Sequence, residues 1–234
     1  MDKLTVFDIL AFLIPGAVFN GLAYYFLLIN QVDLSIFHAE KEPILSSISF
    51  LGLSYIIGFI VSEFAFHLFN KFLSKSDKFN HARIITDEFD TNYLLQLSKY
   101  NQEYYAINIM DKEGNKPVDI KIKESFLIWV ETIAMHTKYG LCTVLHGQYM
   151  LFRNLSIVFL TSMLFLIATL IHFLNASIYL RTDFILVSLF CLALIPISYK
   201  IFASRFKSYT KVTVRAIYSY FANLNYHSKT KNND

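Results

Sequence analysis

Charged residues are scarce in this sequence, and their scarcity excludes most soluble folds. Asp, Glu, Lys and Arg together make up 17% of the 234 residues, whereas soluble domains contain about 25%. Hydrophobic residues reach 55%, and 17% of the residues are aromatic. This composition is typical of a protein that is embedded in a membrane.

Glycine, proline and cysteine are also rare, with 7 Gly, 4 Pro and 2 Cys. So few Gly and Pro residues indicate long helices that are joined by few loops. Cys142 lies in the charged middle of the chain and Cys191 in an apolar stretch, so we expect no disulfide between them. The net charge is only +3, which does not indicate nucleic acid as a direct partner.

What the sequence does contain is long apolar runs. The first, Ile9 to Val32, has no charged residue over about 24 positions, which is enough to cross a bilayer core as a helix. Three more such runs follow, so we predict an all-α integral membrane protein with four transmembrane helices. The predicted first transmembrane hairpin is at 1–72, with spans at about 9–32 and 43–69, and the second is at 151–204, with spans at about 155–180 and 184–203. We predict a small helical cytoplasmic section between the hairpins, at 73–150, and a basic cytoplasmic tail at 205–234.

The distribution of cations predicts the orientation of these spans. The short loops after the first and third spans contain only Lys41 and Arg181 as cations, and most others lie in the middle section and the C-terminal segment. By the positive-inside rule, both termini and the middle section are cytoplasmic. The C-terminal segment also alternates basic and aromatic residues, which suits the anionic surface of the inner leaflet and predicts membrane lipids as partners.

Pro15 and Gly16 interrupt the first apolar run about two turns from its start. Proline removes a backbone hydrogen bond, and glycine lets a neighbouring helix approach. The pair therefore predicts either a kink that shapes a cavity or gate, or a kink that serves helix packing. Gly52 and Gly58 supply small faces of the same kind in the second run.

Glu63 and His67 are four residues apart in an apolar background, so they lie on one face of the second helix. An ionisable pair at membrane depth would be a candidate proton or ion relay. The alternative is that both lie at headgroup level, where charge costs little, because Lys71 follows closely. Arg153, followed by Asn154, marks the point where the third span enters the membrane.

In the middle section, Thr86-Asp87-Glu88 predicts a helix start, and helical periodicity follows it. A turn at 111–117 precedes a second helix that begins near Val118, and the pattern allows this helix to continue without a break through Tyr149 into the third span. Cys142 and His146 have metal-ligand spacing and His136 lies nearby, but no second ligand pair accompanies them. We therefore predict no metal site, no cofactor, no catalytic residue and no enzymatic activity. The candidate functional residues are Pro15, Gly16, Glu63, His67 and Arg153.

Three segments resemble small bacterial four-helix membrane proteins of anti-phage defence systems: FDILAFLIPGAVF, SYIIGFIVSEFAF and YMLFRNLS. Shared features are Pro-Gly in the first span, Tyr-x-x-Gly in the second (Tyr55 to Gly58) and Arg-Asn at the start of the third. The membrane subunit of the Kiwa defence system is similar in size and in its four spans. Where such proteins usually place His after the second-span Gly, this chain has Phe59, which weakens any role built on that His.

The resemblance implies a membrane subunit of the bacterial inner membrane that senses or localises there, forms a homo-oligomer and docks a cytosolic protein effector. A second hypothesis is a pore-forming or membrane-disrupting defence effector, since membrane effectors of cyclic-nucleotide defence systems are similar in build. A third is a small channel or transporter. Internal repeats are typical of transporters, and the first two spans do not resemble the last two.

Overall fold

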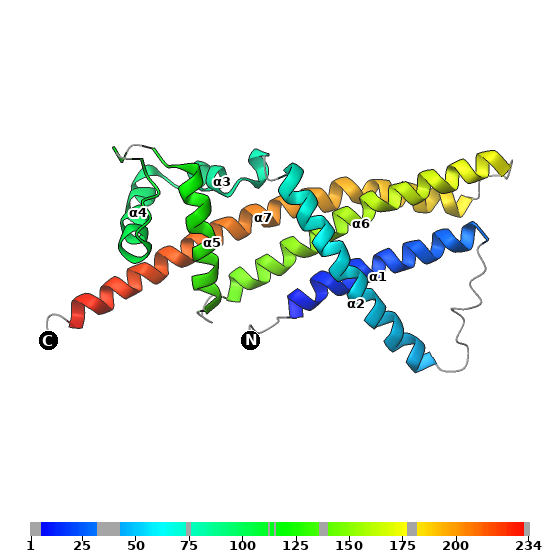
Figure 1. The fold of residues 1–234 in the computed structure, drawn as a ribbon, viewed down its shortest axis with the longest axis horizontal. Coiled ribbons are helices and arrows are strands. Elements are labelled where there is room, and N and C mark those ends of the chain that lie inside the picture. The colour runs from blue at the N-terminus through cyan, green and yellow to red at the C-terminus, as the bar shows by residue number, and fades with distance from the viewer. Residues whose placement is uncertain are drawn as a thin grey trace. The chain divides into compact units, whose positions relative to one another are not determined.

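The computed structural model describes residues 6–31, 43–73, 76–111, 113–114, 116–135, 140–176 and 182–231. Within these ranges the chain is helical, and the only β-type pairing is an isolated bridge between Met110 and Pro117. Figure 1 labels the α-helices, which are α1 (Val6–Ile29), α2 (Pro43–Leu68), α3 (His81–Glu88), α4 (Thr91–Tyr105), α5 (Asp119–Met135), α6 (Gly140–Ala176) and α7 (Thr182–Lys231). Between α2 and α3 lie a π-helical turn, η2 (Phe69–Leu73), and a 3-10 turn, η3 (Asp77–Phe79). The loop predicted at 33–42 and residue His136 lie outside the described residues.

The described chain contains four helices that are long and apolar enough to cross a membrane: 9–29, 46–73, 140–174 and 182–226. The prediction of an all-helical fold with four such helices is confirmed. The apolar segments of α6 and α7 belong to helices of 37 and 50 residues, respectively, which extend well beyond the predicted spans.

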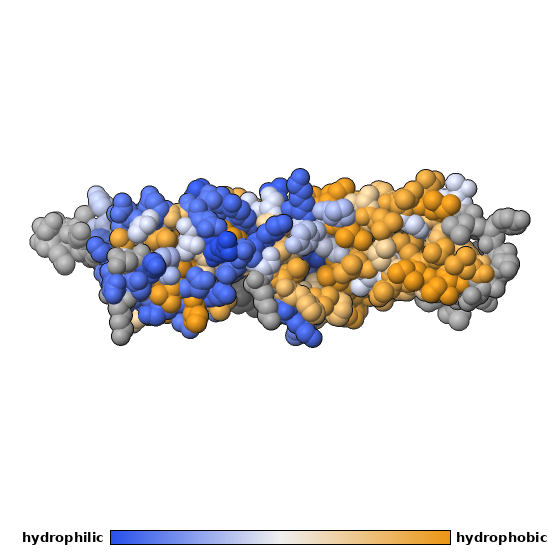
Figure 2. Space-filling view, turned by 90° about the horizontal axis from the view of Figure 1, so that it is seen from above, coloured by the Kyte–Doolittle hydropathy of each residue, from blue (hydrophilic) through white to orange (hydrophobic). Residues whose placement is uncertain are grey.

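The chain divides into two compact units. The first, which we call the span unit, comprises Met1–Phe69 and Gly147–Phe202. Its helices leave large apolar side chains exposed, among them Ile56, Ile60, Leu164, Leu174 and Phe190, each with an exposed fraction of 59–68%. Figure 2 shows hydrophobic residues gathered over these helices. Such a surface suits contact with lipid chains rather than with water.

A smaller set of side chains forms the interior of the span unit. Phe26 and Ile29 of α1 pack with Leu166 and Phe173 of α6, and with Phe184 of α7. The rings of Phe173 and Phe184 meet edge to face with centroids 5.4 Å apart. This cluster joins the two hairpins of the span unit.

The second unit, which we call the helical head, comprises Asn70–His146 and Ala203–Asp234. The predicted tail at 205–234 therefore packs with the middle section rather than apart from it, because α7 buries Phe206, Ile217 and Phe221 there. The ring of Phe221 stacks on Tyr104 of α4 with centroids 4.9 Å apart. Hydrophilic residues are prominent on the surface of this unit (Figure 2).

Local sequence signals set the helix ends in the head. Asp90 caps α4 by accepting a hydrogen bond from the backbone N–H of Tyr93 at 2.7 Å, and α4 ends where Ala106 adopts the left-handed conformation with φ 57°. The predicted turn at 111–117 is confirmed by hydrogen bonds from Asp111 N to Lys116 O and from Gly114 N to Asp111 O, with Gly114 at φ 73°.

One expectation for the head is wrong. Residues 86–88 end α3 instead of starting a helix, because Asn80 caps that helix earlier and Asp90 caps the next one. For the helix expected from Val118 through Tyr149, the structure describes α5 up to Met135 and α6 from Gly140, and residues 136–139 lie outside the described residues.

Candidate functional site

The most unusual group in the span unit is a buried polar cluster around Arg153 and Asn154 of α6. The exposed fractions of these residues are 5% and 0%. Nη2 of Arg153 donates to the hydroxyl of Ser62 at 2.9 Å and to the Ser62 carbonyl at 3.3 Å. The same guanidinium donates through Nε and Nη2 to Oδ1 of Asn154, at 3.2 Å each.

Asn154 extends the cluster to a third helix. Its Nδ2 donates to the backbone carbonyl of Ala11 in α1 at 3.0 Å. Arg153 and Asn154 therefore connect α6 to both helices of the first hairpin. We name the set Arg153, Asn154, Ser62 and Ala11 the Arg–Asn node.

Neutral hydrogen-bond acceptors provide most of the stabilisation of the buried Arg153 guanidinium. Moving a guanidinium out of water costs several kcal/mol (order of magnitude), so its N–H groups need acceptors. Two hydroxyl or carbonyl oxygens and one amide oxygen fill this role, and the Phe66 ring lies 5.9 Å from Cζ of Arg153. The charge of Glu63 also acts on Arg153, without an ion pair between them among the described residues. Arginine does not deprotonate, so the node can hold helices or an anion but cannot relay protons.

Pro15 and Gly16 lie at the crossing of α1 and α2. Both are buried, and a Cβ placed on Gly16 would lie 1.7 Å from the Ser54 carbonyl oxygen. Gly58 mirrors this arrangement, since its Cβ would lie 1.8 Å from the Phe12 carbonyl oxygen. The two glycines therefore permit backbone contact between the helices, which favours the packing role over the gate.

A hydrogen bond reinforces this crossing one turn further along α1. Nδ2 of Asn20 donates to the Ser54 hydroxyl at 3.0 Å. On the opposite side, the Phe12 ring packs on Tyr55 and Phe59, each with ring centroids 5.9 Å apart. The polar group at this depth is thus used to join helices.

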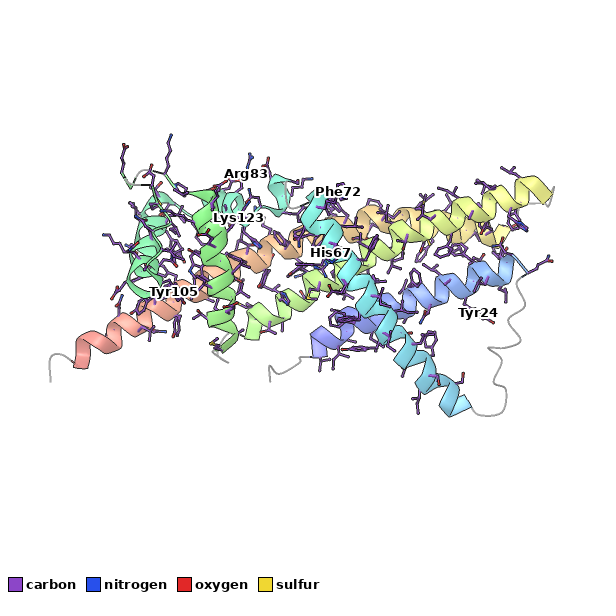
Figure 3. The ribbon with its side chains drawn as sticks, in the orientation of Figure 1. Tyr24, His67, Phe72, Arg83, Tyr105 and Lys123 are labelled. Atoms are coloured by element: carbon purple, nitrogen blue, oxygen red, sulfur yellow. The ribbon has the colours of Figure 1, made fainter. Side chains whose placement is uncertain are left out.

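Glu63 and His67 do not form a pair. Both side chains are exposed on α2, and no hydrogen bond or ion pair joins them among the described residues. His67, which Figure 3 labels on α2, contacts the ring of Phe66 with centroids 6.1 Å apart. Of the five candidate residues, the structure brings Arg153 near Glu63 and Pro15 beside Gly16, and leaves His67 apart.

A cavity of about 330 Å³ lies between α1 and α6 in the span unit. Apolar side chains form most of its wall, and the polar residues Asn30, Thr169 and His172 also line it. Nδ2 of Asn30 donates to the Thr169 hydroxyl at 2.9 Å and to the Phe26 carbonyl at 2.7 Å. Nothing in the sequence distinguishes Asn30 as a cavity residue, because one amide at the end of an apolar run forms no recognisable pattern.

The helical head has a polar network that the sequence also did not reveal. Asn101 of α4 accepts a hydrogen bond from the Trp129 indole N–H at 2.8 Å. Its Nδ2 donates to the Ser125 hydroxyl at 2.9 Å and to the Ile107 carbonyl at 2.7 Å. All the side-chain hydrogen-bonding groups of this fully buried amide are therefore engaged.

His81 is a partly buried polar residue of the head. Its ring stacks on Phe126 with centroids 3.9 Å apart, and Nδ1 lies 2.9 Å from the Thr210 hydroxyl. Burial, aided by the positive charge of Lys123, lowers the pKa of His81 from 6.5 to about 3. The ring is neutral at physiological pH and serves as part of the core.

Cys142 and His146 do not join a metal-ligand cluster. Among the described residues no group of three or more His, Cys, Asp or Glu side chains could hold a metal ion. The His146 ring lies against Tyr209 of α7 with centroids 5.4 Å apart, which is a packing contact.

Comparisons with protein-family models, curated proteins and solved structures find no match to this chain.

Proposed function

We propose that this chain is a membrane-anchored subunit of a bacterial anti-phage defence system that localises at the inner membrane and docks a cytosolic protein effector on its helical head. The observation that carries this proposal is the division into two units with different surfaces. The span unit exposes apolar side chains suited to lipid, whereas the head has its own buried core beneath a largely polar surface. A protein needs both parts if it is to hold a soluble partner at a membrane.

The defence role rests on the sequence resemblance. The orientation, with both termini and the head in the cytoplasm, rests on the distribution of cations. Together they support a partner that is a cytosolic protein rather than an external ligand. Cations along α7, among them Arg205 and Lys207, are exposed and would meet anionic lipids or an acidic partner.

The Arg–Asn node supports an anchoring role for the span unit. Its hydrogen bonds fix α6 against α1 and α2, as a platform requires. The hydrogen bond from Asn20 to Ser54 likewise joins α1 to α2. A conducting pathway needs polar groups that face a passage, and these are directed at neighbouring helices instead.

The test is a phage challenge of the native host, with the chain deleted or restored. Deletion should raise phage plating to the level of an undefended host, and the restored chain should lower it again. Purification of the restored chain in mild detergent should bring a stoichiometric cytosolic protein with it.

Equal plating with and without the gene would overturn the defence role. Leakage of a dye or a steady current from vesicles that contain the purified protein, with no copurifying partner, would favour the pore-forming effector. Orientation is tested separately with Lys121→Cys, an exposed position of α5 that an impermeant thiol reagent should label only from the cytoplasmic side.

A further inference from the structure

The outer face of α5 is more apolar than a solvent-facing helix requires. The helix buries Ile122, Phe126, Trp129 and Ile133 on its inner face. On the other face, Ile120, Leu127 and Met135 have exposed fractions of 70%, 69% and 78%. Ile120, Leu127 and the exposed Ala134 follow each other at seven-residue intervals, the spacing that aligns side chains for contact with another helix.

The charges that border this face complement one another in one particular arrangement. Lys123 precedes Leu127 by four residues and Glu131 follows it by four, and both are exposed. If a second α5 runs antiparallel across a two-fold axis at Leu127, each position before Leu127 meets the equivalent position after it. Lys123 of one copy then faces Glu131 of the other, and the contact occurs twice.

The apolar positions fit the same arrangement. Ile120 would meet the small Ala134 of the second copy, and the two Leu127 side chains would meet at the axis. A self-complementary patch of this kind is what a two-fold interface demands. A parallel arrangement would instead place Lys123 against Lys123 and Glu131 against Glu131, which is repulsive.

We propose that the exposed face of α5 pairs with the same face of a second copy of this chain, antiparallel and centred on Leu127. A lipid surface is the less favourable occupant, because Glu124 and Glu131 on this face would be repelled by anionic headgroups. A helix of 17 residues is about 25 Å long and forms a small interface. Confinement to a membrane raises the effective concentration of such a pair, so the pairing belongs to the membrane-bound protein.

The test uses the full-length chain in native membranes with Leu127→Cys and a short thiol crosslinker. The unsubstituted chain, whose Cys142 and Cys191 are buried, gives the background. A cysteine at a two-fold axis lies close to the same cysteine of the second chain, so a crosslinked band of twice the chain's mass should dominate. Lys121→Cys is the matched control, because it is exposed but is directed away from the Leu127 face. A Leu127→Cys yield no higher than that of Lys121→Cys would overturn the pairing.

A charge exchange then identifies the partner and the direction. In the Leu127→Cys background, Lys123→Glu should lower the crosslinked yield about tenfold, because two attractive pairs become repulsive. Adding Glu131→Lys to the same chain should restore the yield. The experiment is done at pH 8, where the nearby His81 is neutral with either charge at position 123.

Restoration distinguishes a second copy from other occupants. A cytosolic partner or a lipid surface carries no reversed charges, so the double variant would stay low and overturn the proposal. An unchanged yield with Lys123→Glu alone would indicate a parallel pair, in which one like-charge contact at position 123 replaces another, and would overturn the antiparallel geometry. The variants lie on an exposed face, and equal amounts of monodisperse protein in mild detergent check that each one folds.

Discussion

The span unit and the helical head solve the problem of packing helices differently. In the span unit, α1 and α2 approach until backbone meets backbone at Gly16 and Gly58, and Asn20 donates a hydrogen bond to Ser54 beside this crossing. In the head, aromatic rings fill the interior, with Trp129 and Phe221 fully buried. The difference is the one expected for a span unit immersed in lipid and a head in water, because lipid gives apolar surfaces no reason to associate whereas water does.

Polar groups also play different parts in the two units. The Arg–Asn node bonds one helix to the backbones of two others, so its contribution is positional. Asn101 in the head satisfies a loop carbonyl and two side chains among large apolar groups. We therefore expect the head to be sensitive to lost hydrogen bonds and the span unit to be sensitive to added volume.

The largest effect should come from Asn101→Ala in the head. The change leaves the Trp129 N–H, the Ser125 hydroxyl and the Ile107 carbonyl without their partner, at about 1–3 kcal/mol for each buried group. We expect the head to lose about 4 kcal/mol of stability or to unfold, measured by amide hydrogen exchange of α4 and α5. Gln102→Ala, next in sequence but exposed, should stay within about 0.5 kcal/mol of the unsubstituted chain. Equal protection in both variants would contradict this account.

Gly58→Ala should be the next largest and should act on the span unit. The added Cβ would lie 1.8 Å from the Phe12 carbonyl oxygen, so α1 and α2 must separate. Overpacking of this kind costs about 1–3 kcal/mol, and here we expect the upper end. The measurement is thermal unfolding in detergent.

Gly52→Ala is the control on the same helix, since nothing lies within 4 Å of its added Cβ. That change should be neutral or slightly stabilising, because alanine favours a helix by about 0.5–1 kcal/mol over glycine. Identical losses for the two variants would mean that the close crossing does not hold the helices together.

Arg153→Gln tests the positional role of the node. Glutamine can retain a bond to Asn154 or Ser62 but not both, and hydrogen bonds between membrane helices contribute about 0.6 kcal/mol each, so we expect a loss of about 1–2 kcal/mol. The same substitution at Arg83, whose ion pair with Asp77 is more than half exposed, should cost less than about 0.5 kcal/mol. Unfolding in detergent at two salt concentrations separates them, because only the Arg83 effect should shrink in salt. An Arg153 effect as small and salt-dependent as that of Arg83 would contradict burial of the node.

Local features of the sequence predict the helices, but they do not predict which helices contact one another or at which residues. An uncharged run such as Ile9 to Val32 predicts a long helix by itself, because the signal lies in neighbouring residues. Gly52 and Gly58 look alike in sequence, yet only Gly58 meets another backbone. Which glycine lies at a crossing depends on the rotation and height of two helices, which no local pattern encodes.

In the candidate site, too, local signals identify single residues but not their distant partners. Arg153 could be recognised because a charge beside an apolar run is unusual, but its acceptor Ser62 is 91 residues away in sequence. The spacing of Glu63 and His67 predicts a pair on one face of a helix, but both side chains are exposed on α2 and no hydrogen bond or ion pair joins them within the part of the chain that the structure describes. The packing of His81 between Phe126 and Thr210 has no signal in the sequence, since a histidine after a polar turn resembles any surface residue.

His81 supplies the smallest effect at neutral pH and the most selective one in acid. The folded-state pKa of about 3 lies below the unfolded value of 6.5, so only the unfolded chain takes up the proton between these values. The stabilisation is therefore present above pH 6.5 and is lost as the pH falls towards 3, by about 1 kcal/mol at pH 5.5. His81→Phe keeps the stack with Phe126 and loses the Thr210 hydrogen bond, which gives a constant offset but no titration. Unfolding of the two chains from pH 7.5 to 5 should show a head whose acid sensitivity is reduced in the variant, while the span unit responds alike in both. Parallel pH profiles for the head would mean that His81 takes up its proton in the folded chain.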